Sequence, residues 1–258
     1  MTRPREAPLG DDDARRFDVQ RVYVPEEQTR LGRWLAYMRD NPLFTIGVML
    51  LSIFLGLAVI GPYFVGDPLR TDIAAMYSPP STEHWFGTDE YGRDIFARSV
   101  HAARLDLSIG IVIALVAMII GSAVGVVSGY FGGRVDEVVM RLTDILLAFP
   151  GFVLALIIVA ALDESILNVV IAVAAAYVPY FIRLTRAQAL VEREKEYADA
   201  ARLAGNGPFR TAFRHVMPNS LRPALVSATL VTGWAVLTVA GLAFLSVGIQ
   251  PPRAEWGV

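Results

Sequence analysis

The residue types that most often carry out chemistry are scarce in this 258-residue chain. It has no cysteine, which excludes a thiolate nucleophile, a disulfide framework and a cysteine-ligated metal. Its three histidines are His84, His101 and His215. His84 precedes the stretch "FGTDEYGRD", Phe86 to Asp94, whose three acids could ligate a metal or act as acid and base. Metal ligation needs converging ligands with supporting hydrogen bonds, so in this glycine-containing loop we favour a turn that organises the surface.

Composition points to a membrane protein and not to a soluble enzyme. Hydrophobic residues make up 54% of the chain and charged residues 19%. The pattern Gly-x-x-x-x-Gly-Lys-Ser/Thr, which cradles phosphates, does not occur, so we expect no ATP hydrolysis by this chain. A net charge of -2 and a pI of about 5.9 give no overall attraction to nucleic acid. The first 30 residues have no apolar core, so they are not a signal peptide, and we expect residues 1–40 to be a flexible cytoplasmic tail.

Five stretches lack Asp, Glu, Lys, Arg and His and are long enough to cross a hydrocarbon core of about 30 Å as a helix. They are Leu43–Val65, Leu107–Phe131, Ile145–Leu162, Ser165–Ile182 and Ala224–Gln250. The sequence therefore predicts an all-α polytopic membrane protein with five transmembrane helices. Because no ionisable group lies within a span, a proton relay or buried ion pathway is not expected. Pro150 and Pro179 fall within spans, where they can kink a helix.

The basic residues predict which side each segment faces. Of the 23 lysines and arginines, 18 fall in the tail, in residues 132–144 and in residues 183–223. Positively charged loops stay on the cytoplasmic side, so the amino terminus and the loop 183–223 are predicted to be cytoplasmic. The loop 66–106 and the tight turn at Asp163 and Glu164 are then predicted to be on the outer side.

Three glycines of the second span recur every four residues: Gly121, Gly125 and Gly129. They put a smooth strip on one helix face, which favours close packing against another helix. Glycine is also simply frequent in membrane helices, and periodicity alone does not separate the two explanations.

A polar segment rich in small residues, "EYADAARLAGNGPFRTAFRHVMPN", occupies residues 196–219 between two spans. It predicts a helix over about 187–204, closed by Gly205 in a left-handed conformation, and a second helix that ends before Pro218. Four residues at helical spacing share a face of the first helix: Tyr197, Ala200, Ala201 and Ala204. Such a shallow face can receive another protein or pack on the chain's own spans.

The spacing in this segment resembles the coupling loop of permease subunits of ATP-binding-cassette importers. That loop has Glu-Ala-Ala, three residues, Gly, nine residues and Ile-x-Leu-Pro. The matching positions are Asp199, Ala200, Ala201, Gly205, His215, Met217 and Pro218, with Asp for Glu, His for Ile and Met for Leu. Residues 84–110, 128–150 and 244–258 are similar, in the right order, to the peptide, dipeptide and nickel branch of that family. The resemblance covers about residues 41–258 and is to the C-type permease of oligopeptide importers.

The resemblance implies a type I importer permease bundle over residues 41–258, with six spans in the family, so a sixth is expected beyond Val258. The residues that it implies for coupling to an ATPase are Tyr197, Asp199, Ala200, Ala201, Arg202, Gly205, His215, Pro218 and Asn219. The partners that it implies are a second homologous permease subunit, two ATPase subunits or domains, an extracytoplasmic substrate-binding protein and membrane lipid. ATP and Mg²⁺ would bind to the ATPases, and no cofactor or metal is expected on this chain.

The function implied is that of a permease subunit in the bacterial cytoplasmic membrane, which forms half of a pathway for peptides. Oligopeptides or dipeptides are favoured as cargo, and nickel chelates, heme and glutathione stay open. A secondary transporter is the first alternative, but it would usually place ionisable or unwound sites at mid-membrane. A membrane-embedded hydrolase is the second, and it lacks a cysteine or a histidine within any span.

Overall fold

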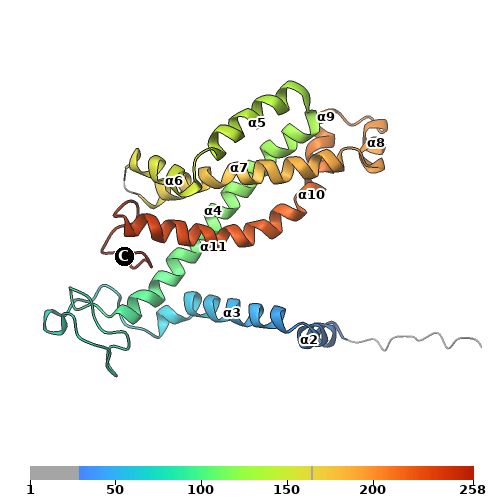
Figure 1. The fold of residues 1–258 in the computed structure, drawn as a ribbon. Helices are drawn as coiled ribbons and strands as arrows, with labels where there is room; N and C mark the ends of the chain where they lie inside the picture. Colours follow the sequence, from blue (N-terminus) through green and yellow to red (C-terminus); the bar gives the residue numbers. More distant parts are fainter. Residues whose placement is uncertain (1–28, 164) are drawn as a thin grey trace, which may run out of the picture. The chain divides into compact units, whose positions relative to one another are not determined.

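The computed structural model describes residues 29–163 and 165–258, in which the regular secondary structure is helical apart from one isolated bridge between Thr88 and Asp94. The helices are shown in Figure 1. Their bounds are α2 Arg30–Asp40, α3 Pro42–Val59, α4 Ile95–Phe131, α5 Gly133–Leu147, α6 Gly151–Ala160, α7 Ile166–Glu192, α8 Glu196–Leu203, α9 Pro208–Thr211, α10 Met217–Ser220 and α11 Arg222–Phe244. Short 3₁₀ turns cover Gly61–Tyr63 and Ile73–Ala75, and a π-helical turn covers Ala212–Val216. The chain divides between Ser52 and Ile53 into two compact units, which are described in turn.

In the first unit, α2 occupies part of what the sequence predicts as a flexible tail. That prediction is wrong for residues 30–40, and residues 1–28 lie outside the described part of the chain. The Thr29 hydroxyl accepts a hydrogen bond from the Gly32 N–H at 3.3 Å and so caps the first turn of α2. At the other end, Asn41 donates from its backbone N–H and from Nδ2 to the Tyr37 carbonyl. These bonds form an elbow between α2 and α3, which begins at Pro42.

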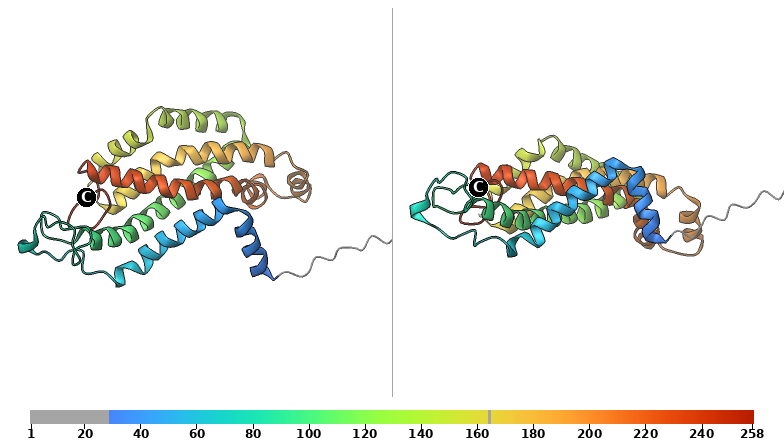
Figure 2. Two further views of the ribbon diagram at one scale, coloured as in Figure 1. Left: turned by 60° about the horizontal axis from the view of Figure 1, so that its bottom comes forward. Right: turned by 90° about the horizontal axis from the view of Figure 1, so that it is seen from below.

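The second unit is a helical bundle in which α4 packs against α7 and α11 (Figure 2). Its fully buried side chains include Ile113 of α4, Phe181 of α7 and Leu242 of α11. The three glycines of the second predicted span lie where α4 meets α7. A Cβ at Gly121 would come within 2.5 Å of the Phe181 Cβ, and one at Gly129 within 2.7 Å of a carbonyl of α7. The glycines therefore let the two backbones approach each other.

In the described part of the chain, four helices are long and apolar enough to cross a membrane, and the bent pair α5 and α6 makes a fifth crossing if it counts as one span. The third predicted span, residues 145–162, is not one continuous helix, because α5 and α6 meet at 86° just before Gly151. Pro150 precedes that helix and disfavours helical geometry at Phe149. Pro179, in contrast, lies inside α7, which runs unbroken from Ile166 to Glu192.

Two predictions for the polar segment are wrong in detail. The helix expected over 187–204 breaks after Glu192, and α8 starts at Glu196. The helix expected to end before Pro218 continues through a π-helical turn into α10. Pro218 follows directly on this π-helical turn, so the change in helix geometry coincides with the residue that has no backbone N–H to donate.

The last residues of the chain return to the amino-terminal end of α4. Arg98, which is buried, donates to the carbonyls of Pro252 and Arg253, both at 3.3 Å. The Trp256 backbone N–H donates to Asp106 at 3.1 Å, and the indole donates to the Ser99 carbonyl at 3.0 Å. Residues 245–258 are thus bound to α4 by side chains that are 150 or more positions away in sequence.

Candidate functional site

The polar segment is bonded to the membrane helices through Glu192, Arg193 and Arg202, hereafter the joint. The buried carboxylate of Glu192, at the end of α7, makes the first of these contacts. Its Oε1 accepts from Lys195 Nζ at 2.7 Å and from Gln188 Nε2 at 3.0 Å. Its Oε2 accepts from the Tyr197 hydroxyl at 2.7 Å. Burial and the hydrogen bond to Glu192 raise the pKa of Tyr197 to about 12. The phenol therefore stays protonated and acts as a donor at neutral pH.

Two arginines complete this joint. Arg193 Nη1 donates to the Gly129 carbonyl at 2.9 Å and so ties the end of α7 to the end of α4. Arg202 of α8 donates to the Arg193 carbonyl at 2.9 Å and to Asp199 at 2.6 Å. Its guanidinium also lies 5.6 Å from the centre of the Tyr130 ring. Because these bonds reach both α4 and α7, a force on α8 would be passed to both helices.

The two sides of α8 have different surroundings. Ala198 is buried in a small apolar cluster that also contains Val126, Ala189, Ala212 and Val216, and Ala201 on the same helix is buried as well. Tyr197 packs against the same cluster. Ala200 and Ala204 are exposed instead, and Leu203 beside them is 90% exposed. The predicted face of one tyrosine and three alanines is therefore divided between the chain's own core and an open surface.

Gly205 ends α8 in the left-handed conformation that the sequence predicts, with φ of +79°. The Gly205 N–H donates to the Arg202 carbonyl at 3.0 Å, and the Asn206 N–H donates to the Ala201 carbonyl at 3.2 Å. This pair of bonds is a Schellman motif. A Cβ on Gly205 would meet no atom within 4 Å, so the requirement for glycine comes from φ alone.

The remaining predicted residues lie beyond the turn. Asn219 Nδ2 donates to the His215 carbonyl at 2.9 Å, which keeps both residues within the helical run that leads into α11. Pro218 is exposed, and His215 and Asn219 are half-buried. Phe209, which the sequence does not single out, is 66% exposed and packs against Phe131 with ring centres 4.9 Å apart and ring planes tilted by 50°. With Ala200, Leu203 and Ala204 it forms the open surface of the segment, hereafter the 200–209 surface.

Sequence reasoning missed Glu192, Arg193 and Tyr130. The five-residue separation of Glu192 and Tyr197 is not a helical spacing, so no periodic pattern connects them. Arg193 and Tyr130 are 63 residues apart, and only the packing of α4 on α7 brings them together. No signal in the chain would have found them without the fold.

The acidic loop of residues 66–106 uses its carboxylates to build turns. Asp89 accepts from the backbone N–H groups of Tyr91 and Arg93, each at 2.9 Å, and from Arg93 Nε at 2.6 Å. Burial raises the pKa of Asp89, but these hydrogen bonds lower it by more. Asp94 accepts from His84 at 2.9 Å and caps α4 through the Ala97 N–H. Within residues 29–163 and 165–258 no three His, Asp or Glu side chains converge as a metal site would require.

The fold and the joint define a multi-pass α-helical membrane protein with a polar segment held firmly on its central helices. The chain belongs to the family of binding-protein-dependent transport system inner membrane components, whose pattern matches residues 121–258. It is therefore a permease component of an importer.

Curated relatives cover most of the chain. A dipeptide transport system permease protein of Alkalihalophilus pseudofirmus is 40% identical over 238 residues, which span 90% of this chain and 78% of the relative. A probable D,D-dipeptide transport system permease protein of Escherichia coli is 39% identical over 90% of this chain and 79% of its own length. A glutathione transport system permease protein of Pectobacterium atrosepticum is 36% identical over 87% and 75%. The similarity thus extends beyond the matched family region to the loop of residues 66–106.

Proposed function

We propose that this permease subunit imports short peptides across the bacterial cytoplasmic membrane and that the 200–209 surface docks on a partner ATPase. The amino terminus and residues 183–223 lie on the cytoplasmic side in this proposal, and residues 66–106 face the binding protein outside. A second homologous permease would complete the pathway. ATP and Mg²⁺ would bind to the two ATPase subunits or domains.

The observation that carries the proposal is a short, capped helix presented on a rigid base. The side of α8 that carries Ala198 and Ala201 is buried, whereas Ala200 and Leu203 lie open. Small residues let a partner surface come close, and the exposed Leu203 supplies an apolar anchor for a pocket. A helix held in this way can be pushed without being deformed.

Motion of the ATPases would pass through the joint into the spans. Glu192 links α8 to α7, and Arg193 links α7 to α4. Because the glycines of α4 also let its backbone pack closely against that of α7, we expect the two helices to move as one body. A displacement of α8 would then tilt both helices and change access to the pathway.

Peptides are proposed as the cargo because the relatives described above are named for dipeptides, D,D-dipeptides and glutathione. Uptake of labelled dipeptides, tripeptides and glutathione into cells that express the complete transporter ranks these candidates. Uptake that survives an uncoupler but stops on ATP depletion is expected. The reverse result would point to an ion gradient as the energy source.

The docking role is tested at Gly205. In Gly205→Val a β-branched residue must adopt φ of +79°, which costs about 1–2 kcal/mol and favours opening of the α8 cap. We expect the assembled transporter to lose peptide transport about tenfold. Gly205→Asn is the matched control, because asparagine tolerates this conformation, and it should transport nearly as the wild type does. If the valine variant assembles and transports normally, the capped α8 has no role in coupling.

A further inference from the structure

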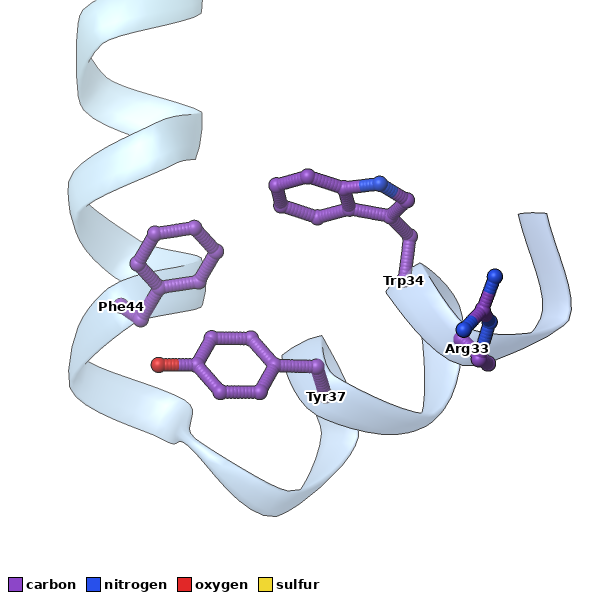
Figure 3. Close-up of a pocket in the computed structure, with 4 residues that line it drawn as sticks. All are labelled: Arg33, Trp34, Tyr37 and Phe44. Atoms are coloured by element: carbon purple, nitrogen blue, oxygen red, sulfur yellow. The ribbon is translucent and has the colours of Figure 1, made fainter. Parts of the chain in front are cut away.

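The first unit carries a cavity that the transport function does not use. It has a volume of about 520 Å³ and is lined by Arg33, Trp34 and Tyr37 of α2 and by Phe44 of α3 (Figure 3). The volume lies within the range of ordinary small-molecule sites, which is about 300–1,000 Å³. Its lining combines three aromatic rings with one guanidinium.

The three aromatic rings contact one another, but their side chains are largely exposed. The Phe44 ring lies 5.2 Å from the Tyr37 ring, edge to face, and 6.5 Å from the Trp34 ring. Trp34 is nevertheless 60% exposed and Tyr37 53% exposed. Tryptophan and tyrosine with one apolar and one polar end are enriched where a membrane helix enters the headgroup layer. Phe44 is the third residue of the apolar helix α3, so the cavity lies beside the first turn of that helix.

The elbow between α2 and α3 holds the cavity in shape. Thr45 Oγ1 donates to the Met38 carbonyl at 2.5 Å, and Asn41 Nδ2 donates to the Tyr37 carbonyl at 2.9 Å. The sequence of α2 includes three arginines and an aspartate, so α2 cannot continue into hydrocarbon. A helix with polar and aromatic residues, bonded at an angle to a membrane span, is suited to lie along the membrane surface.

The charge at the cavity is positive. Arg33 is exposed and forms no ion pair with any carboxylate in the described part of the chain. Arg39, on the same helix, does not line the cavity, and its Nε lies 3.4 Å from Asp40. Figure 3 shows Arg33 at the side of the cavity opposite Phe44, so a guanidinium at one end and aromatic rings along the rest complement a molecule with a phosphate at one end and an apolar body at the other.

We propose that this cavity binds one anionic phospholipid of the adjacent leaflet. Arg33 pairs with the lipid phosphate, and Trp34, Tyr37 and Phe44 hold the glycerol and the first part of an acyl chain. The bound lipid fixes α2 on the membrane surface. The inference rests on the membrane placement proposed above but not on the cargo or on the ATPase contact.

The test is native mass spectrometry of the purified, fully assembled transporter titrated with phosphatidylglycerol or phosphatidylcholine. We expect tighter retention of phosphatidylglycerol by the wild type. Arg33→Gln should weaken that retention about fivefold, the effect of one basic residue near an anionic surface. Trp34→Ala should weaken retention of both lipids. These readouts do not depend on transport, so a failure here is distinguishable from a failure of the proposed function.

Arg39→Gln is the matched control and should change phosphatidylglycerol retention less than about twofold, since its guanidinium is already near Asp40. An equal loss in Arg39→Gln and Arg33→Gln would show general surface attraction and overturn the site. Equal retention of the two lipids by the wild type would also overturn it. Displacement of the lipid by an equal concentration of inorganic phosphate would show a free-anion site instead. Cross-linking of residue 33 to a partner subunit, with no lipid retained, would show a protein contact.

Discussion

Glu192 is the residue on which the contact between α7 and α8 depends most. Its side chain is 6% exposed, and it accepts hydrogen bonds from Lys195, Tyr197 and Gln188. A buried carboxylate is stable only when its oxygens are paired in this way. The three bonds therefore stabilise the charge and, through it, the angle between the two helices.

Glu192→Gln is expected to destabilise this joint for two reasons. The amide oxygen is a weaker acceptor than a carboxylate, and the amide N–H₂ group would face Lys195, Tyr197 or Gln188, which are themselves donors. We expect a loss of about 1–3 kcal/mol in stability, measured by thermal unfolding, together with reduced coupling of ATP hydrolysis to transport. Glu194→Gln is the control, since Glu194 is exposed and pairs only with Arg193. It should change stability by less than about 0.5 kcal/mol. Equal effects of the two variants would contradict the role of the buried carboxylate.

Glu255 is a second buried acid, and it makes the attachment of residues 245–258 depend on pH. It is 3% exposed, and its Oε2 accepts from the Gly257 N–H at 2.6 Å. Burial raises the pKa of Glu255, and the hydrogen bond from Gly257 lowers it by less. A raised pKa means that the docked segment holds the proton more tightly than the released segment does. The resulting stability is present below the ordinary pKa of a glutamate and is lost as pH rises through the raised value.

We therefore expect amide protection of Trp256 and Gly257, corrected for intrinsic exchange, to fall as pH rises from about 4 to 8. Glu255→Gln, which is always neutral, should keep its protection at the higher pH and lose the dependence. Hydrogen exchange followed by mass spectrometry measures both. The same pH dependence in the variant would assign the effect to another group, such as the neighbouring Asp106.

At the scale of elements, the contact between α4 and α7 depends on the absence of side chains. A Cβ at Gly125 would lie 2.6 Å from the Ile182 carbonyl oxygen and 3.0 Å from the Arg186 N. These are backbone atoms, which cannot move aside as a flexible side chain can. Small residues at such an interface let the helices gain dispersion contacts that lipid would not supply.

Gly125→Ala should separate α4 from α7 and destabilise the protein by about 1–3 kcal/mol. Gly233→Ala is the matched control, because Gly233 lies in α11 and a Cβ there meets nothing within 4 Å. The control should be neutral or stabilising by up to about 1 kcal/mol, since alanine favours a helix. Thermal unfolding in detergent distinguishes the expected loss of stability in Gly125→Ala from the expected neutral or stabilising effect in Gly233→Ala. Equal midpoints would mean that the helices repack without cost.

At the scale of the whole molecule, the distribution of charge predicts the sidedness of the loops. The chain has no cysteine, so a single introduced thiol reports its own location. Ser81 in the loop of residues 66–106 and Arg210 of α9 are both exposed. Thr211, beside Arg210, is fully buried, and a thiol there would report burial instead of sidedness.

With a membrane-impermeant thiol reagent on intact cells, Ser81→Cys should be labelled and Arg210→Cys should not. Arg210→Cys should react after the cells are permeabilised. The physical reason is that positively charged segments such as residues 183–223 are retained on the cytoplasmic side. Labelling of Arg210→Cys alone in intact cells would invert the topology.

The amino-acid sequence by itself determines where the chain meets lipid and where it must turn. Uncharged runs of 18 or more residues can satisfy their backbone polar groups in hydrocarbon only as helices, so the spans are readable without tertiary information. Gly205 is readable for a similar local reason, because a glycine after a helix followed by Asn, Gly and Pro is a strong end signal. The order and spacing of the coupling-loop residues can also be recognised from the sequence alone.

Tertiary structure alone decides which side chains form the joint and where the regular elements break. Hydrogen bonds of Glu192 and Arg193 to partners outside their own helix end α7 early, although residues 187–204 have good helical propensity. Ala201 is buried whereas Ala200 beside it is exposed, and periodicity alone leaves that choice undecided. Pro150 marks a break in the third predicted span, but the 86° size of the bend before Gly151 is not readable from the sequence. The contact of Arg193 with Gly129 joins residues 64 positions apart, so local patterns carry no record of it.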